Sequence, residues 1–326
     1  MGNNWLFTIY IVLSSFMSLK SVKSKIKSID KTRQVTKAME AVSAVKMRKS
    51  QAGAIGIRPY ATSALKILRS ISTSIDAINH PLTSVRPIKR TLVILVSADK
   101  GLAGSYGSAL LKQAYKFMAE KSLTKENTDL VCVGKKAYEH FNKRGWSVLE
   151  HFEKWSDGVQ FDGVAPLAEK VKNEFLAGRA DQAFIVYTNF VSTLNQQVVG
   201  RQLLPVTRDG VEDVVRGIVP EKGKFAELRS ESNDPVVREY TFEPSAEIIL
   251  SELIPTLFNI QIFHSVLESN ASEHSARMIA MKNASDNAKE ISRGLKLHFN
   301  KVRQSAITRE VSEIVGGMES MKVVDA

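Results

Sequence analysis

A turn with three glycines follows the apolar run Thr91–Ser97. Of all the patterns in this sequence, it most resembles a known binding motif, the phosphate-binding turn of α/β folds. A short β-branched run is typical of a buried strand, and a glycine-rich turn between a strand and a helix is where α/β folds bind phosphates. Gly101, Gly104 and Gly107 have the spacing GxxGxxG, which differs from the dinucleotide fingerprint GxGxxG. The next strand ends at Val133-Gly134 without an acid that would bind a ribose. We therefore expect no dinucleotide cofactor here.

The other residue types that carry catalysis or bind metals also form no recognisable motif. The histidines show no metal-ligand spacing with cysteines or acids, and we expect each to be structural or exposed; they are His80, His140, His151, His264, His274 and His298. The sequence has no GxxxxGK[ST] phosphate loop and no serine or cysteine in a nucleophile motif. The one cysteine, Cys132, lies in an apolar run and is expected to be a buried free thiol. We therefore expect no catalytic residue, no cofactor, no metal and no enzymatic activity of the chain alone.

The middle of the chain, residues 88–208, alternates apolar strands with amphipathic helices. The expected strands are Thr91–Ser97, Leu130–Val133, Ala183–Thr188 and Gln196–Val206, and the expected helices are Ser108–Lys121, Lys135–Lys143 and Val164–Leu176. Such alternation predicts a mainly parallel sheet in a three-layer, Rossmann-like α/β domain. Residues 209–243 are rich in charge, glycine and proline and are expected to be an irregular connection.

Long stretches at both ends of the chain lack helix breakers. No proline follows Pro255, and Gly294 is the only glycine between Thr256 and Val315, so about 60 residues could form one helix roughly 90 Å long. The stretch Ser18–Gln51 also lacks proline and glycine. Because such a helix exceeds the diameter of a domain, it must protrude or pair with another helix. Glu243-Pro244-Ser245 is expected to begin the C-terminal helix, with Ser245 as a candidate N-cap.

Apolar residues recur in both stretches at intervals of three and four, close to the coiled-coil period. The C-terminal stripe is Met278, Met281, Ala284, Ala288, Ile291, Leu295, Phe299 and Val302, and the N-terminal stripe is Val22, Ile26, Ile29, Val35, Met39 and Val42. We therefore predict a shaft, which is a long antiparallel coiled coil of the N-terminal helix (17–80) and the C-terminal helix (244–326), with the α/β domain inserted between them.

The positive charge of the chain is concentrated in the N-terminal helix. The 326 residues carry a formal charge of +11, and the segment from Lys20 to Lys49 has ten basic and two acidic residues. This pattern is consistent with a solvated face, a nucleic-acid surface, an anionic membrane or an acidic protein sleeve. From Met17 to Pro59 there is no aromatic residue, which disfavours single-strand binding by stacking and insertion into a membrane surface.

Residues 1–16 differ from the rest. The apolar run Trp5–Leu13 is too short to span a bilayer, has no basic flank and is followed by no clear cleavage site. We expect Met17 to be the native start and residues 1–16 to be a non-native or disordered extension. The alternative is a weak hydrophobic anchor.

Several long motifs, in order, resemble the gamma subunit of F-type ATP synthases. They are IKSIDKTRQVTKAMEAVSAVKMRKSQ (26–51), SADKGL (97–102), SEHSARMIAMKNASDN (272–287) and FNKVRQSAITREVSEIV (299–315). The resemblance covers roughly residues 18–318. It implies a central rotor shaft that binds no nucleotide itself and couples proton flow to ATP synthesis or hydrolysis by rotating within a ring of three alpha and three beta subunits. Further implied partners are the c-ring, epsilon and, in some complexes, delta. The implied location is the cytoplasmic side of a bacterial plasma membrane, as a peripheral protein.

The resemblance also implies three contact regions. Lys46, Met47, Arg48 and Lys49 match the basic stretch that contacts the acidic lever loop of the beta subunit. Arg303, Gln304 and Thr308 match the upper-shaft contacts with the catalytic ring, and Tyr240, Phe242 and Glu243 match the foot on the c-ring.

Two other classes of function remain open from the residues alone. A basic coiled-coil protein that binds nucleic acid would show binding that falls steeply with salt and needs no partner subunit. The other class is a Rossmann-type enzyme with helical dimerisation arms. Only the α/β segment supports that interpretation, and the segment has no recognisable site.

Overall fold

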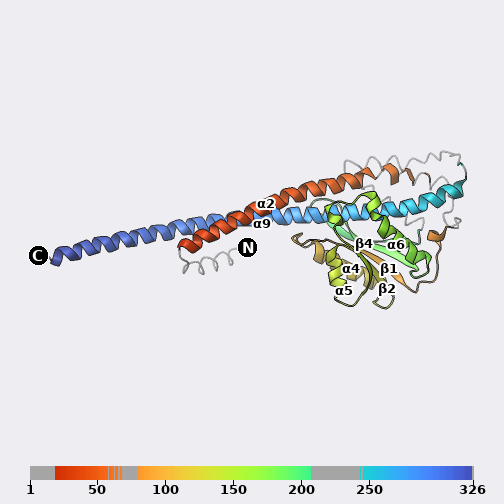
Figure 1. Ribbon diagram of the computed structural model, residues 1–326, viewed down its shortest axis with the longest axis horizontal. Helices are drawn as coiled ribbons and strands as arrows, with labels where there is room; N and C mark the ends of the chain where they lie inside the picture. The colour runs from red at the N-terminus through yellow and green to blue at the C-terminus, as the bar shows by residue number, and fades with distance from the viewer. Residues whose placement is uncertain are drawn as a thin grey trace. The chain divides into compact units, whose positions relative to one another are not determined.

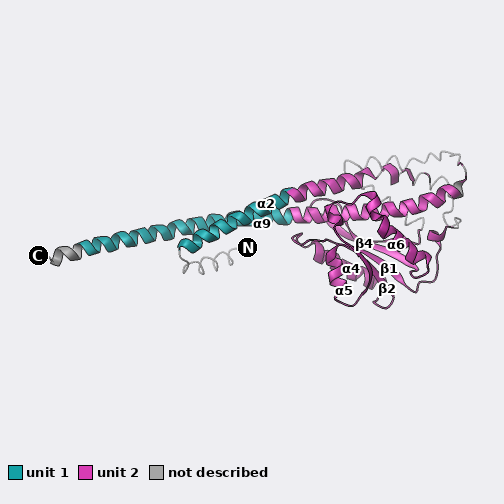
Figure 2. Ribbon diagram, viewed as in Figure 1, with its two compact units in different colours: residues 1–41, 279–326 teal, residues 42–278 magenta. Residues whose placement is uncertain are grey.

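The computed structural model describes residues 19–57, 59–61, 63, 64, 67, 80–206, 243 and 245–324. The chain divides into two compact units: unit 1 is residues 1–41 with 279–326, and unit 2 is residues 42–278 (Figure 2). Two long helices, α2 (Leu19–Gly56) and α9 (Ala246–Val324), contribute to both units (Figure 1). The predicted fold class, long terminal helices with an inserted α/β domain, is confirmed.

The sheet of unit 2 has five strands in the order β3-β2-β1-β4-β5. They are β1 (Thr91–Val96), β2 (Thr128–Val133), β3 (Ser147–Phe152), β4 (Gln182–Phe190) and β5 (Gln196–Leu204). The first four are parallel to their neighbours, with Thr91 opposite Thr128 and Gln182, whereas β5 runs antiparallel to β4. The mainly parallel sheet was predicted, but β3 was not. It is an edge strand whose side chains are exposed or half-buried, so its sequence SVLEHF lacks the apolar run of a central strand.

Helices cover both faces of the sheet. On one face, α4 (Tyr106–Glu120) and α5 (Lys135–Asn142) pack on Val93, Leu95 and Cys132. On the other face, α6 (Ala165–Leu176) and the first part of α9 share a core with Leu92, Ile94 and Val96. Short 3₁₀ turns at Pro81–Thr83, Trp155–Asp157 and Phe161–Val164 complete the described connections. Part of the long C-terminal helix is thus a layer of the α/β unit itself, which the sequence had not indicated.

Hydrogen bonds join α9 to the sheet beneath it. Ser269 Oγ donates to the carbonyl of Val96 at 3.4 Å, and Ser272 Oγ donates to that of Thr188 at 3.2 Å. Among the described residues, α9 is the one helix long and apolar enough to cross a bilayer, and 50% of that window is buried in the protein. The apolar residues of the first part of α9, among them Phe258, Ile262 and Val266, belong to the hydrophobic core of unit 2, so this part of α9 is a core helix. The predicted cap is confirmed: Ser245 Oγ accepts a hydrogen bond from the Ile248 amide at 3.3 Å.

The buried stripes of the long helices differ from the predicted ones. Val35, Val42 and Ile291 are 58%, 55% and 39% exposed, so their predicted places in the stripes were wrong. The neighbouring hydroxyl residues Thr36, Ser43 and Ser292 are buried instead. In unit 1, the buried positions of α9 repeat at intervals of four and three: Met281, Ser285, Ala288, Ser292 and Leu295. Small hydroxyl side chains suit such a seam when they find hydrogen-bond partners.

One such partner is Asp30, on the N-terminal helix of the same unit. Ser292 Oγ donates to Asp30 Oδ1 at 2.7 Å, and Lys296 Nζ lies 3.2 Å from Asp30 Oδ2. The hydrogen bond from Ser292, followed by the contact with Lys296, holds the pKa of the Asp30 carboxyl below its usual range. A polar contact between the two helices specifies their register, because sliding one helix would separate the partners.

Candidate functional site

The predicted basic stretch lies on α2 within unit 2, and its four residues face different surroundings. Met47 is 8% exposed, whereas Arg48 and Lys49 are exposed. The Lys46 side chain is 34% exposed, and its ammonium forms an ion pair with Asp157. Of the four residues, only Arg48 and Lys49 are exposed.

The predicted upper-shaft residues Arg303, Gln304 and Thr308 are all exposed on α9 in unit 1. Between residues 303 and 318 every residue except Ala306 is exposed. This segment includes five apolar side chains that were not predicted as contacts: Ile307, Val311, Ile314, Val315 and Met318, each 51–65% exposed. Their spacing of four, three, one and three places them along one helix face. An exposed apolar stripe of this kind marks an interaction surface.

Of the predicted foot, Tyr240 and Phe242 lie outside the described residues. Glu243 is exposed, in a bend shortly before α9.

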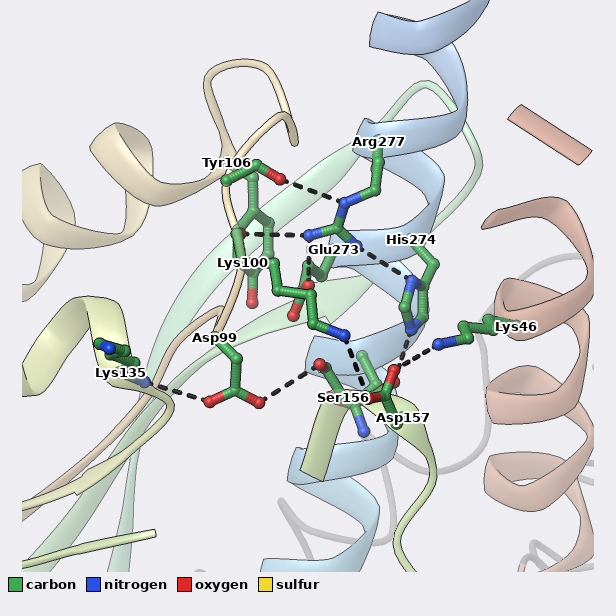
Figure 3. A network of polar contacts seen from close by, with 12 residues as sticks. Lys46, Asp99, Lys100, Tyr106, Lys135, Ser156, Asp157, Glu273, His274 and Arg277 are labelled. Carbon is green, nitrogen blue, oxygen red and sulfur yellow. Dashed lines mark hydrogen bonds and ion pairs between the residues drawn. The ribbon is translucent and has the colours of Figure 1, made fainter. Parts of the chain in front are cut away.

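A cluster of charged side chains, unrecognised in the sequence, lies where β1 ends against α9 (Figure 3). It joins Asp99 and Lys100, which follow β1, to Glu273, His274 and Arg277 of α9. The Arg277 guanidinium is the centre: it lies 2.6 Å from Glu273 Oε1 and donates to the carbonyls of Gly101 (3.3 Å) and Lys100 (3.2 Å). Both motifs, SADKGL and SEHSARM, were visible in the sequence. Their meeting was not, because no local pattern shows that two distant segments touch.

Burial shifts the pKa values of Glu273 and His274 in opposite directions. Glu273 is 1% exposed, and burial raises the pKa of its carboxyl to about 7 although Arg277 opposes the shift. Burial also lowers the pKa of His274 to about 4, so its ring is neutral near pH 7. Nε2 of that ring lies 2.7 Å from the Ser156 carbonyl, which requires a donor, and Nδ1 lies 3.1 Å from Arg277 Nη1. The contacts therefore fix the neutral tautomer of His274 that carries its proton on Nε2 and accepts a hydrogen bond at Nδ1.

The remaining contacts of the cluster are also internal. The Tyr106 hydroxyl lies 2.7 Å from Ser269 Oγ, and burial raises the pKa of that hydroxyl above its ordinary value. Within the part of the chain that the structure describes, no group of histidine, cysteine, aspartate or glutamate residues could hold a metal ion. Cys132 is buried, as predicted, and burial raises the pKa of its thiol to about 12. The cluster has the character of a rigid joint between α9 and the sheet.

We expect Glu273 and His274 to oppose each other in the pH dependence of stability. Glu273 holds its proton more tightly in the folded state, so its contribution is present below about pH 4.5 and is lost as pH rises towards 7. His274 binds its proton less tightly when folded, so its contribution increases as pH rises from about 4 to 6.5. Between about pH 4.5 and 6.5, the stability of the Glu273→Gln variant relative to the parent chain should therefore increase with pH. The stability of the His274→Gln variant relative to the parent should decrease with pH.

Urea unfolding of the two variants and the parent at several pH values between about 4.5 and 6.5 measures these slopes, which cannot exceed about 1.4 kcal/mol per pH unit for one proton. The matched controls make the same substitutions, Glu120→Gln and His151→Gln, at side chains that are 60% and 42% exposed. Equal slopes for Glu273→Gln and His274→Gln would contradict the opposing assignment.

Comparison with known proteins identifies the family. The family model described as ATP synthase matches residues 18–321. The ATP synthase gamma chain of Cytophaga hutchinsonii is 39% identical over 308 residues, which cover 93% of this chain and 99% of the relative. The corresponding protein of Chlorobaculum tepidum is 36% identical over 309 residues, covering 94% and 99%.

Solved structures show the same fold. The central stalk and c-ring structure of the Tetrahymena thermophila mitochondrial ATP synthase contains a chain that matches with a TM-score of 0.56 at 24% identity, covering 77% of this chain and 99% of that one. A chain of the Euglena gracilis mitochondrial enzyme, in a structure of OSCP, F1 and c-ring, matches with a TM-score of 0.59 at 17% identity, covering 93% and 94%. With relatives aligned over almost their whole length, the chain belongs to the ATP synthase gamma chain family.

Proposed function

We infer that this protein is the rotor subunit of a proton-transporting ATP synthase. It has no catalytic role alone, and it couples proton flow through the membrane sector to ATP synthesis or hydrolysis in a surrounding ring by rotating. The observation that carries this inference is the alignment with gamma chains over 99% of their length, including both long terminal helices. Nothing in the fold or the comparisons favours the nucleic-acid-binding alternative.

The proposed partners follow from the same family membership. Related structures contain the central stalk together with a c-ring, or F1 with OSCP and a c-ring. For this chain we propose the alpha and beta subunits as the ring around the shaft, and the c-ring and epsilon at its base, with delta as a further member of the complex. The protein would act as a peripheral component on the cytoplasmic side of a bacterial plasma membrane.

The proposed contact surfaces are those that the described residues leave exposed. Arg48 and Lys49 suit an acidic loop of the beta subunit because their charges face solvent. Arg303, Gln304 and Thr308, with the apolar stripe from Ile307 to Met318, suit the inner surface of the ring. Tyr240, Phe242 and Glu243 remain the proposed foot on the c-ring.

Reconstitution tests the inference directly. Purified alpha and beta subunits should show ATPase activity that rises at least about tenfold when this chain is added, because asymmetry of the shaft sets the states of the three catalytic sites. The chain alone should show no ATP hydrolysis. Starting the chain at Met17 should give the same activity as the full chain. ATP turnover by the isolated chain, or ring activity indifferent to its addition, would contradict the proposed function.

A further inference from the structure

The 3₁₀ turn Trp155–Asp157, here called the clasp turn, lies between β3 and α6 and contacts both long helices within unit 2. On the α9 side, Asn270 Nδ2 donates to the Trp155 carbonyl at 2.9 Å, and the His274 ring donates to the Ser156 carbonyl at 2.7 Å. Two successive carbonyls of the turn are thus held by one face of α9. Because both donors are on a buried segment, this attachment is shielded from water.

Asp99 holds the clasp turn from the side of the sheet. Its Oδ2 accepts hydrogen bonds from the Lys154 amide at 2.9 Å and from Ser156 Oγ at 3.3 Å, and its Oδ1 accepts one from the Lys135 amide at 3.2 Å. The turn also needs an unusual backbone: Lys154 has φ 69° and Gly158 has φ 127°. A residue with positive φ at each end makes the turn tight. The hydrogen bonds to Asp99 and to α9 together set its position.

The clasp turn directs Asp157 toward α2 (Figure 3). One carboxylate oxygen pairs with Lys46 of α2, and the other lies 3.2 Å from Lys100 Nζ, in the loop after β1. Two cations from separate elements therefore share one carboxylate. The hydrogen bond from Lys46 is the largest cause that holds the pKa of Asp157 below its usual range, so the group is ionised near pH 7.

Holding Lys46 has a geometric consequence for its neighbours on α2. Successive helical residues are about 100° apart around the axis, so Arg48 is about 200° from Lys46, on nearly the opposite face. Met47, which is 8% exposed, lies between them on the buried side of α2, so pairing Lys46 with the clasp turn on one flank leaves Arg48 on the other flank. The observed exposures agree, since Arg48 is exposed and Lys46 is half-buried.

We propose that Asp157 is a positioning residue for coupling: the clasp turn fixes the rotation of α2 about its axis in unit 2 by holding Lys46, and so presents Arg48 to the partner ring. This proposal rests on the proposed rotor function and adds that Lys46 acts within the chain instead of on the beta subunit. Asp157 touches no reacting group. Its effect is to keep α2, which carries Arg48, from rotating about its own axis when the complex transmits torque.

A charge exchange tests the proposal in the reconstituted complex. The variants are Lys46→Glu, Asp157→Lys and the double variant, with Asp157→Asn as an isosteric loss of charge. The measurement is protons pumped per ATP hydrolysed in vesicles, with circular dichroism to check folding. Each single variant should lower the pumping ratio roughly twofold or more, and the double variant should recover at least about half of the loss. Recovery is partial because the ammonium introduced by Asp157→Lys would face Lys100.

A matched control exchanges the exposed pair of α4, Lys116→Glu with Glu120→Lys, whose groups lie 3.7 Å apart. It should leave pumping unchanged. A double variant that pumps no better than the worse single variant would overturn the proposal and would place Lys46 in contact with a partner instead. Unchanged pumping in all variants would also overturn it. Failure of the parent chain to support pumping is a separate result, because it contradicts the rotor function.

Discussion

Replacing Arg277 with methionine is expected to destabilise the chain by about 3–5 kcal/mol at about pH 8. The methionine would leave the Glu273 carboxylate, which is 1% exposed, without its counter-charge. It would also remove the donors that satisfy the carbonyls of Lys100 and Gly101. At about pH 5.5 the loss should be smaller by roughly half, because Glu273 then folds in its neutral form. Denaturant unfolding at the two pH values measures both effects.

The double variant Arg277→Met with Glu273→Gln separates charge burial from packing. At about pH 8 it should be about 2 kcal/mol more stable than Arg277→Met alone, because no buried charge remains. Its destabilisation should be the same at the two pH values. Arg309→Met, which breaks an exposed ion pair with Glu313, is the control and should change stability by less than about 1 kcal/mol. A loss for Arg277→Met that is the same at both pH values would show that the ion pair is not its cause.

Reversing two charges, Arg48→Glu with Lys49→Glu, is expected to lower the pumping ratio of the reconstituted complex several-fold while the isolated chain keeps its helical signal. Both side chains are exposed on α2, so folding should not depend on them. Reversal would place like charges together against the acidic partner surface that we propose. The measurement is proton pumping per ATP in vesicles, together with circular dichroism of the isolated chain.

The matched control makes the same change of net charge elsewhere, with Lys112→Glu and Lys116→Glu on exposed positions of α4. If the control lowered pumping as strongly as Arg48→Glu with Lys49→Glu, the effect would belong to net charge and not to this surface. A loss of helical signal in the α2 variant would show that the basic residues hold the fold.

The central part of the sheet could be predicted from the sequence because burial on both faces selects continuous apolar runs. β1 reads TLVILV, and β2 and β4 carry similar runs, so strand positions follow from local composition. β3 was missed because an edge strand needs no such run. The seam of the long helices was misplaced by one residue at Val35 and Ile291, because periodicity was assigned to the most apolar residue within reach. The structure buries Thr36 and Ser292 instead, and Ser292 is satisfied by Asp30.

The site was less predictable than the fold. Lys46 was predicted to contact the beta subunit, but its ion-pair partner Asp157 lies 111 residues away, in a turn with no sequence signature. Likewise, Arg277 and Lys100 belong to separate motifs, and only the packing of α9 on the sheet brings them together. Long-range pairs of this kind depend on tertiary contacts, which residue spacing does not encode.

Rotation of the chain within the ring tests the central claim most directly. A cysteine introduced at Lys116, which is 67% exposed on α4, gives a labelling site, and the native Cys132 is buried and should stay unlabelled. A bead attached there, on a complex fixed through its ring, should turn in one direction during ATP hydrolysis, in steps of about 120° set by the threefold ring. A bead that stays fixed relative to the ring while ATP is hydrolysed at the full rate would contradict the account.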